Sequence, residues 1–148
     1  MDGGKIPGVA LFTSEPPSGG YIAELFLGWV RIARTLTGED RYYAVTPDFW
    51  RDSAKGRFND SIIILMSCFG FVDDTLGNIF IEKGASVFIG WNEKVTTEHM
   101  DRATLVLLET ILNGKIPISE AVEYTMQKVG ADPIYGSVLK FYTEKMKS

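Results

Sequence analysis

The stretch Ser61-Ile62-Ile63-Ile64-Leu65-Met66-Ser67-Cys68-Phe69-Gly70 decides the expected fold. Its apolar run, residues 62–66, includes three β-branched side chains, which is typical of a strand buried on both faces. We expect this strand at the centre of a sheet. Cys68 is the only cysteine of the chain and follows the strand almost directly. Because α/β proteins bind ligands outside the carboxyl ends of their strands, Cys68 is the first candidate for chemistry.

The composition indicates one compact domain, residues 1–148. With 148 residues and 45% hydrophobic content, the chain is long enough to bury roughly 68–70% of its unfolded surface. A net charge of -4 argues against nucleic acid as a partner, because phosphate binding depends on clustered Lys and Arg. One cysteine permits no internal disulfide, which is compatible with a reducing cytosol. The amino terminus lacks an apolar signal region, and no apolar run approaches the ~20 residues of a membrane span, so we expect a cytoplasmic protein without membrane contact.

Short β-rich runs alternate with longer helical periods along the chain. This alternation predicts βα units in an α/β fold, with three αβα layers around a mainly parallel sheet. The predicted strands are residues 9–13, 42–45, 62–66 and 85–90. The predicted helices are 21–36, a brief one opened by Thr46-Pro47-Asp48, one from Asp73 and Asp74 to Gly84, 97–113, 119–129, and a last segment from Pro133 through Tyr142.

His99 is the only histidine and is a second candidate for chemistry. It lies in the first turn of the helix that follows strand 85–90, so it is expected at the same sheet edge as Cys68. This geometry allows a Cys–His pair, with Glu98 or Asp101 orienting the imidazole. The simpler interpretations are that His99 is a surface residue and that Cys68 is a small buried hydrophobe.

The loop after strand 85–90 contains Trp91, Asn92 and Glu93, which are candidates to line a substrate cleft. The alternative is a packed indole with two solvated neighbours. The glycines form no phosphate-binding pattern after a strand, so no nucleotide is expected. One Cys and one His are too few for the usual structural zinc site, and we therefore expect no metal and no other cofactor.

Residues 61–129 resemble the C-terminal part of the caspase-like cysteine peptidase clan, especially its gingipain-like and CHAT-type branches. The resemblance depends on four features in order. These are a strand ending in Ser67-Cys68 with Gly70 behind it, the segment Phe80-Ile81-Glu82-Lys83-Gly84-Ala85, the strand Val87-Phe88-Ile89-Gly90-Trp91, and Asn113-Gly114 followed by Ser119-Glu120-Ala121-Val122. The resemblance implies a caspase-like fold in which Cys68 is the nucleophile. The clan's catalytic histidine precedes the cysteine, and this chain has none there, which implies a truncated or shortened relative.

Two classes of function follow. In a cysteine peptidase or related thiol hydrolase, Cys68 would attack a carbonyl, and the amides near Phe69 and Gly70 would stabilise the oxyanion. In a caspase-like domain without catalysis, the chain would have a structural role or bind a protein or peptide partner. The missing upstream histidine favours the second class. Four aromatic residues predicted to be exposed would fit a partner surface, and a symmetric homodimer is the default self-association. They are Tyr42, Tyr43, Phe49 and Trp50.

Overall fold

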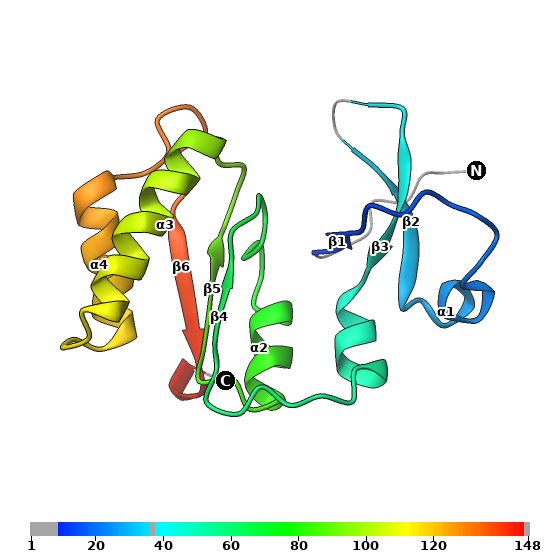
Figure 1. The fold of residues 1–148 in the computed structure, drawn as a ribbon, viewed down its shortest axis with the longest axis horizontal. Helices are drawn as coiled ribbons and strands as arrows, with labels where there is room; N and C mark the ends of the chain where they lie inside the picture. The colour runs from blue at the N-terminus through cyan, green and yellow to red at the C-terminus, as the bar shows by residue number, and fades with distance from the viewer. Residues whose placement is uncertain (1–8, 36–37, 147–148) are drawn as a thin grey trace. The chain divides into compact units, whose positions relative to one another are not determined.

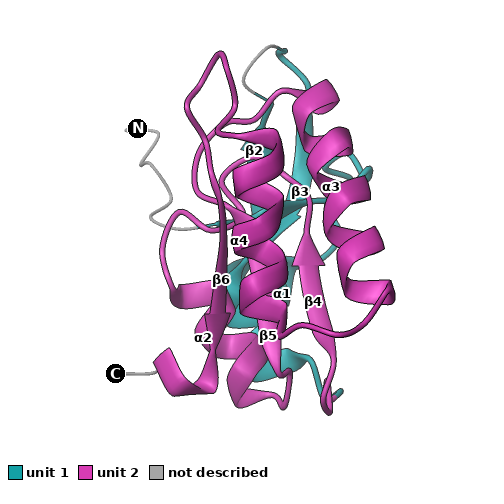
Figure 2. Cartoon of the chain, turned by 90° about the vertical axis from the view of Figure 1, so that its left-hand side faces the viewer, with its two compact units in different colours: residues 1–56 teal, residues 57–148 magenta. Residues whose placement is uncertain are grey.

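The computed structural model describes residues 9–35 and 38–146. These residues form two compact units, one within residues 1–56 and the other within residues 57–148 (Figures 1 and 2). Each unit is built around its own three-stranded sheet. Among the described residues, no helix combines the length and the apolar character that crossing a bilayer requires.

The first unit contains an antiparallel sheet in the order β1-β3-β2. β2 and β3 form a hairpin whose register runs from Val30 opposite Val45 to Arg34 opposite Arg41. A short helix precedes the hairpin and a single π-helical turn follows it. The elements of this unit are β1 (Leu11–Phe12), α1 (Ile22–Leu27), β2 (Val30–Arg34), β3 (Arg41–Val45) and η1 (Phe49–Ser53).

The predicted helix 21–36 is wrong in its second half. α1 ends at Leu27 because Gly28 adopts a left-handed conformation with φ of 78°, which glycine reaches without steric cost. The amide of Trp29 then donates to the carbonyl of Glu24 and closes the helix end. The following residues, 30–34, pair with β3 instead of continuing the helix. The apolar spacing that imitated a helix therefore spans a helix, a turn and a strand.

The second unit contains a mixed sheet in the order β4-β5-β6. β4 runs parallel to β5, and β6 runs antiparallel to it. α3 and α4 cover one face of this sheet and α2 covers the other (Figures 1 and 2). The elements are β4 (Ile62–Leu65), α2 (Thr75–Glu82), β5 (Val87–Trp91), α3 (Thr97–Leu112), α4 (Ile118–Val129), β6 (Leu139–Thr143) and η2 (Glu144–Met146).

The core of the second unit follows the alternation of β5. Val87, Ile89 and Trp91 lie in the apolar cluster formed with α3 and α4. Phe88 points to the opposite face and stacks on Phe80 of α2, with ring centroids 5.7 Å apart. All five residues of β5 are buried, so both faces of the central strand are covered.

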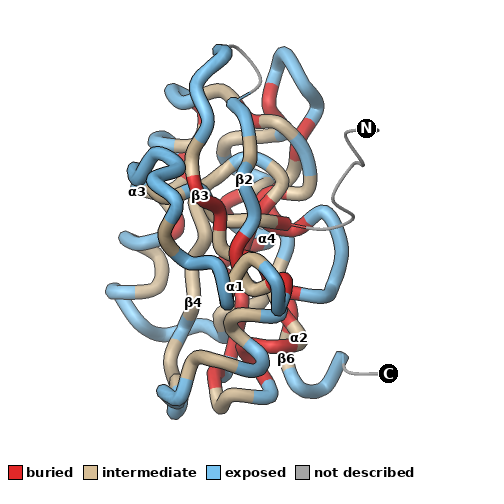
Figure 3. Tube along the Cα trace, turned by 90° about the vertical axis from the view of Figure 1, so that its right-hand side faces the viewer, coloured by how far each residue is buried: buried red, intermediate tan, exposed pale blue. Residues whose placement is uncertain are grey.

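Three expectations about this sheet are wrong. The chain does not form the single, mainly parallel sheet expected of a caspase-like αβα domain, because it has two small sheets, one antiparallel and one mixed. The strand at 62–66 is not central: β4 is an edge strand, half-buried along most of its length (Figure 3). The segment expected to be helical after Pro133 forms β6 over 139–143, because its apolar residues pair in register with the buried β5.

Candidate functional site

Cys68 lies in the loop that follows β4, and its side chain is exposed. The thiol contacts the backbone carbonyl of Val95, with Sγ 3.5 Å from the oxygen. The next residue, Phe69, has a φ of 59°, a conformation that bulky residues rarely adopt. The loop therefore places an accessible thiol at the carboxyl edge of the parallel strand pair, as the position of Cys68 after the strand suggested.

The loop after Cys68 is hydrogen-bonded to the end of β5. The amide of Phe69 donates to the carbonyl of Glu93 at 3.1 Å, and the amide of Phe71 donates to Trp91 at 2.8 Å. Gly70 is buried against Gly90, where an added Cβ on Gly90 would lie 3.2 Å from the Gly70 carbonyl carbon. Because the Phe69 amide already has an acceptor, it is not free to stabilise an oxyanion.

His99 lies at the start of α3 with only 4% of its surface exposed. Its Nε2 is 3.0 Å from the carbonyl oxygen of Gly130, and its ring packs edge-on against Trp91. In residues 9–35 and 38–146, no hydrogen bond joins this imidazole to the thiol of Cys68. The structure thus directs the ring of His99 towards a loop carbonyl and the indole.

The two residues expected to orient His99, Glu98 and Asp101, are both exposed. Glu98 is exposed and forms an ion pair with Arg102, Oε1 to Nη2 3.4 Å, one turn along α3. Asp101 is exposed on the same helix. Neither makes a hydrogen bond with the imidazole in the part of the chain that the structure describes. Within the described residues, hydrogen bonds therefore do not connect the four residues proposed for a catalytic pair and its support.

Trp91 and Asn92 hold the fold together at this edge. Trp91 is fully buried in the core formed with α3 and α4. The side-chain oxygen of Asn92 accepts from the amide of Val138 at 2.9 Å and from the hydroxyl of Ser137 at 3.2 Å. Ser137 is itself fully buried and accepts from the amide of Glu93. These contacts tie the end of β5 to the residues that lead into β6.

Asp132 is a buried residue that was not among those predicted from the sequence. One carboxylate oxygen accepts from the amide and the hydroxyl of Thr96, and the other accepts from the amides of Ile134 and Tyr135. Burial alone would raise the pKa of this carboxyl, but the hydrogen bonds, led by the one from the Thr96 amide, hold the pKa well below its usual range. The signal in the sequence is Asp132-Pro133, a turn-forming pair between two regular elements.

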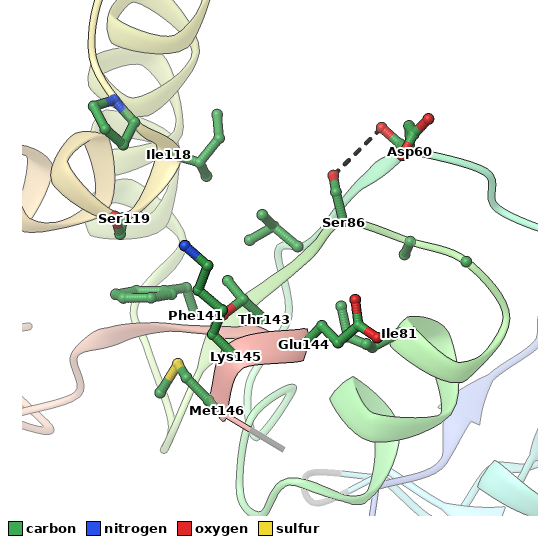
Figure 4. A pocket seen from close by; sticks show the side chains of 14 residues that line it. Asp60, Ile81, Ser86, Ile118, Ser119, Phe141, Thr143, Glu144, Lys145 and Met146 are labelled. Atoms are coloured by element: carbon green, nitrogen blue, oxygen red, sulfur yellow. Dashed lines mark hydrogen bonds between the residues drawn. The ribbon is translucent and has the colours of Figure 1, made fainter.

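A larger hollow lies at the other end of the sheet, where β5 begins and β6 ends. This cavity has a volume of about 710 Å³, within the usual range of small-molecule sites. Figure 4 shows the side chain of Lys145 reaching across it towards Ser119 at the start of α4. Apolar and polar side chains both line it. Its labelled walls are Asp60, Ile81, Ser86, Ile118, Ser119, Phe141, Thr143, Glu144, Lys145 and Met146.

A smaller groove of about 230 Å³ extends along α4 and β6. Phe141, in the middle of β6, contributes to the lining of both hollows. The groove is lined mainly by apolar side chains, with one acidic and one basic neighbour. They are Val122, Glu123, Met126, Leu139, Lys140 and Phe141. Helix α4 and the edge strand β6 thus border this groove.

The outer edge of β6 has amide groups without a strand partner. In the described residues, β6 pairs only with β5, and the amide of Asn92 donates to the carbonyl of Val138. Antiparallel alternation then turns the amides of Leu139, Phe141 and Thr143 away from β5. The Leu139 amide contacts the sulfur of Met126 at 3.1 Å. The amides of the other two residues have no acceptor within the described ranges.

The aromatic residues of the first unit do not form the exposed cluster that was expected. Tyr43 is 3% exposed, and its hydroxyl donates to the carbonyl of Gly20 at 3.1 Å. Tyr42, Phe49 and Trp50 are half-buried. The prediction of an exposed surface is therefore wrong for Tyr43, whose ring forms part of the core of its unit.

Comparisons with known proteins identify no family. The chain matches no protein-family model, and neither the curated proteins nor the solved structures contain a significant match. The resemblance of residues 61–129 to caspase-like peptidases therefore stays a prediction from the sequence.

Proposed function

We propose that this protein is a peptide-binding module that has no thiol chemistry of its own. The observation that carries the proposal is the open edge of β6 beside the groove along α4. An extended peptide adds to such an edge as a further strand, with main-chain hydrogen bonds giving affinity and side-chain pockets giving specificity. The amides of Phe141 and Thr143 are the donors for this strand.

The hollows on either side of Phe141 supply the side-chain pockets. Side chains alternate between the two faces of an added strand, so every second one would point towards α4. There the apolar walls, Val122 and Met126 among them, suit apolar side chains of the peptide. The larger cavity beyond Phe141 offers both apolar surface and the charged groups Glu144 and Lys145.

The position of His99 argues against the alternative of a thiol hydrolase. General-base activation of a cysteine requires an imidazole within hydrogen-bond reach of the thiol. The chain has one histidine, and its ring is buried against Trp91 and Gly130. The proposal does not depend on the caspase-like resemblance.

The test is a selection of random peptides displayed on phage against the whole chain, followed by titration of a selected, fluorescently labelled peptide. We expect selected peptides to be rich in alternating apolar residues. Thr143→Pro removes an outward amide without removing a hydrogen bond to β5, and proline is tolerated on edge strands. It should weaken binding by about 10-fold or more, a change of ~1.4 kcal/mol.

Thr143→Val is the matched control, because it keeps the amide and changes only the hydroxyl. We expect its affinity for the selected peptide to match that of the unmodified chain. Failure to enrich any peptide would contradict the proposal. Equal binding by the Thr143→Pro chain would show that peptides bind elsewhere and would also overturn it.

A further inference from the structure

The hollow at the end of β6 contains a lysine whose charge is not neutralised by a neighbour. Lys145 stands in η2, shortly after β6 ends at Thr143. Its side chain crosses the hollow towards Ser119 at the start of α4 (Figure 4). Within residues 9–35 and 38–146, its ammonium group forms no ion pair. The hollow therefore presents a positive charge to a ligand.

The acidic side chains of the same hollow lie apart from this ammonium group. Glu144 points towards Ile81, and Asp60 lies on the side of the hollow away from Ser119 (Figure 4). Neither carboxylate forms an ion pair in the part of the chain that the structure describes. The positive charge of Lys145 thus stands on the α4 side of the hollow and the negative charges stand on the other side.

The groove of the proposed peptide site follows this same α4 side. Its walls come from α4 and β6, and Phe141 lines both the groove and the hollow. A peptide added to β6 in the parallel direction has its carboxyl end near Thr143, whereas an antiparallel peptide has its amino end there. A carboxylate is attracted to Lys145, and an amino terminus is repelled by it. The charge on the α4 side therefore favours the parallel direction.

We propose that the peptides bound along β6 end at this hollow with a free α-carboxylate, which the ammonium group of Lys145 and the hydroxyl of Ser119 bind. The inference rests on the proposed function and names its ligand class: the carboxyl-terminal ends of chains, not internal segments. Charge-assisted hydrogen bonds to a carboxylate are stronger than neutral ones. The last side chain of the peptide would contact Val87 and Phe141, so an apolar residue suits that position.

Two phage libraries test whether a free carboxyl end is required. In one library, the peptides extend the carboxyl end of a coat protein and finish in a free carboxylate. In the other, the carboxyl end of each peptide is joined to the coat protein. We expect the whole chain to enrich peptides mainly from the first library. Equal enrichment from both would overturn this inference and leave the proposed function standing, whereas no enrichment from either would overturn both.

Titration with a selected peptide, synthesised as the free acid and as the amide, tests the role of Lys145. We expect amidation to weaken binding by about 3- to 10-fold, between the effect of an exposed ion pair and that of a charge-assisted hydrogen bond. Lys145→Gln should weaken binding of the acid by the same factor and leave the affinity for the amide unchanged. A merely structural change would weaken the binding of both forms alike.

Lys115→Gln is the matched control. It removes the same charge from an exposed lysine that lines neither hollow, so the affinities for the acid and the amide should both stay as in the unmodified chain. If amidation weakened binding equally in the unmodified chain and in Lys145→Gln, another group would bind the carboxylate, and the proposed role of Lys145 would be wrong.

Discussion

The two sheets of this protein differ in how their faces are covered. In the second unit, helices lie on both faces, and every residue of the central strand β5 is buried. In the first unit, the sheet has buried positions such as Val30, Tyr43 and Ala44, but α1 has no buried residue. Phe26 of that helix is 90% exposed. Packing on both faces stabilises a sheet far more than hairpin pairing alone, so the second unit should carry most of the stability.

The largest expected effect tests this difference directly. Phe88→Ala removes a fully buried ring from β5 and should lower the free energy of unfolding by about 3–5 kcal/mol. The same change in the first unit, Phe26→Ala, should stay within ~0.5 kcal/mol because that ring is already exposed to water. Urea denaturation followed by circular dichroism measures both. A comparable loss of unfolding free energy in the two variants would contradict the difference between the units, because Phe26 of α1 would then have to be buried.

The second prediction compares a glycine of each unit, Gly90 and Gly20. They differ in how closely other atoms approach the position that a Cβ would occupy. At Gly90 an added Cβ would meet the backbone of Gly70 at 3.2 Å, and neither segment can move easily. We expect Gly90→Ala to destabilise the chain by about 1–3 kcal/mol. At Gly20 an added Cβ would find its nearest neighbour at 3.7 Å. Gly20→Ala should therefore be neutral or stabilise the chain by up to ~1 kcal/mol, measured in the same denaturation series.

The sequence predicted the second unit better than the first. β4, β5, α3 and α4 occur close to the expected positions, because buried strands and long amphipathic helices have strong periodic patterns. The segment after Pro133 was misassigned because Leu139 and Tyr142 fit a helical period, whereas pairing with β5 makes them a strand. The direction of β6, and hence the mixed sheet, depends on that long-range pairing and has no local signal.

The candidate site was predictable only in part. The position of Cys68 after a strand follows from the local pattern, and the structure places it there. The burial of His99 depends on Trp91 and on the carbonyl of Gly130, which lies 31 residues away in the chain. The groove beside β6 has no counterpart in the sequence prediction, because a helix in that segment would have no strand edge. Sites formed by long-range pairing are thus outside the reach of local patterns.

A third prediction concerns the loop that Asp132 organises in the second unit. Asp132→Asn removes the charge that accepts four hydrogen bonds and should lower the free energy of unfolding at neutral pH. Folding lowers the pKa of this carboxyl. Its contribution to the free energy of unfolding is therefore complete above the unfolded pKa of ~3.9 and is lost as the pH falls below that value. Denaturation curves of the two chains should therefore converge in acid. A difference that is independent of pH would contradict this account.

The smallest expected effect is an unchanged alkylation rate of Cys68 when His99 is replaced. It tests whether the exposed thiol and the buried imidazole act independently. Iodoacetamide should label Cys68 in the folded chain without denaturant, because its side chain is exposed. His99→Gln should leave the labelling rate unchanged, because the ring of His99 packs on Trp91 and lies beside the carbonyl of Gly130. Mass spectrometry after timed quenching gives both rates, and Cys68→Ser supplies the unlabelled control. A large drop in rate on changing His99 would mean that the imidazole reaches the thiol in solution, which would favour the hydrolase over the peptide-binding module. An unchanged rate leaves Cys68 as an accessible thiol without a base, as the geometry requires.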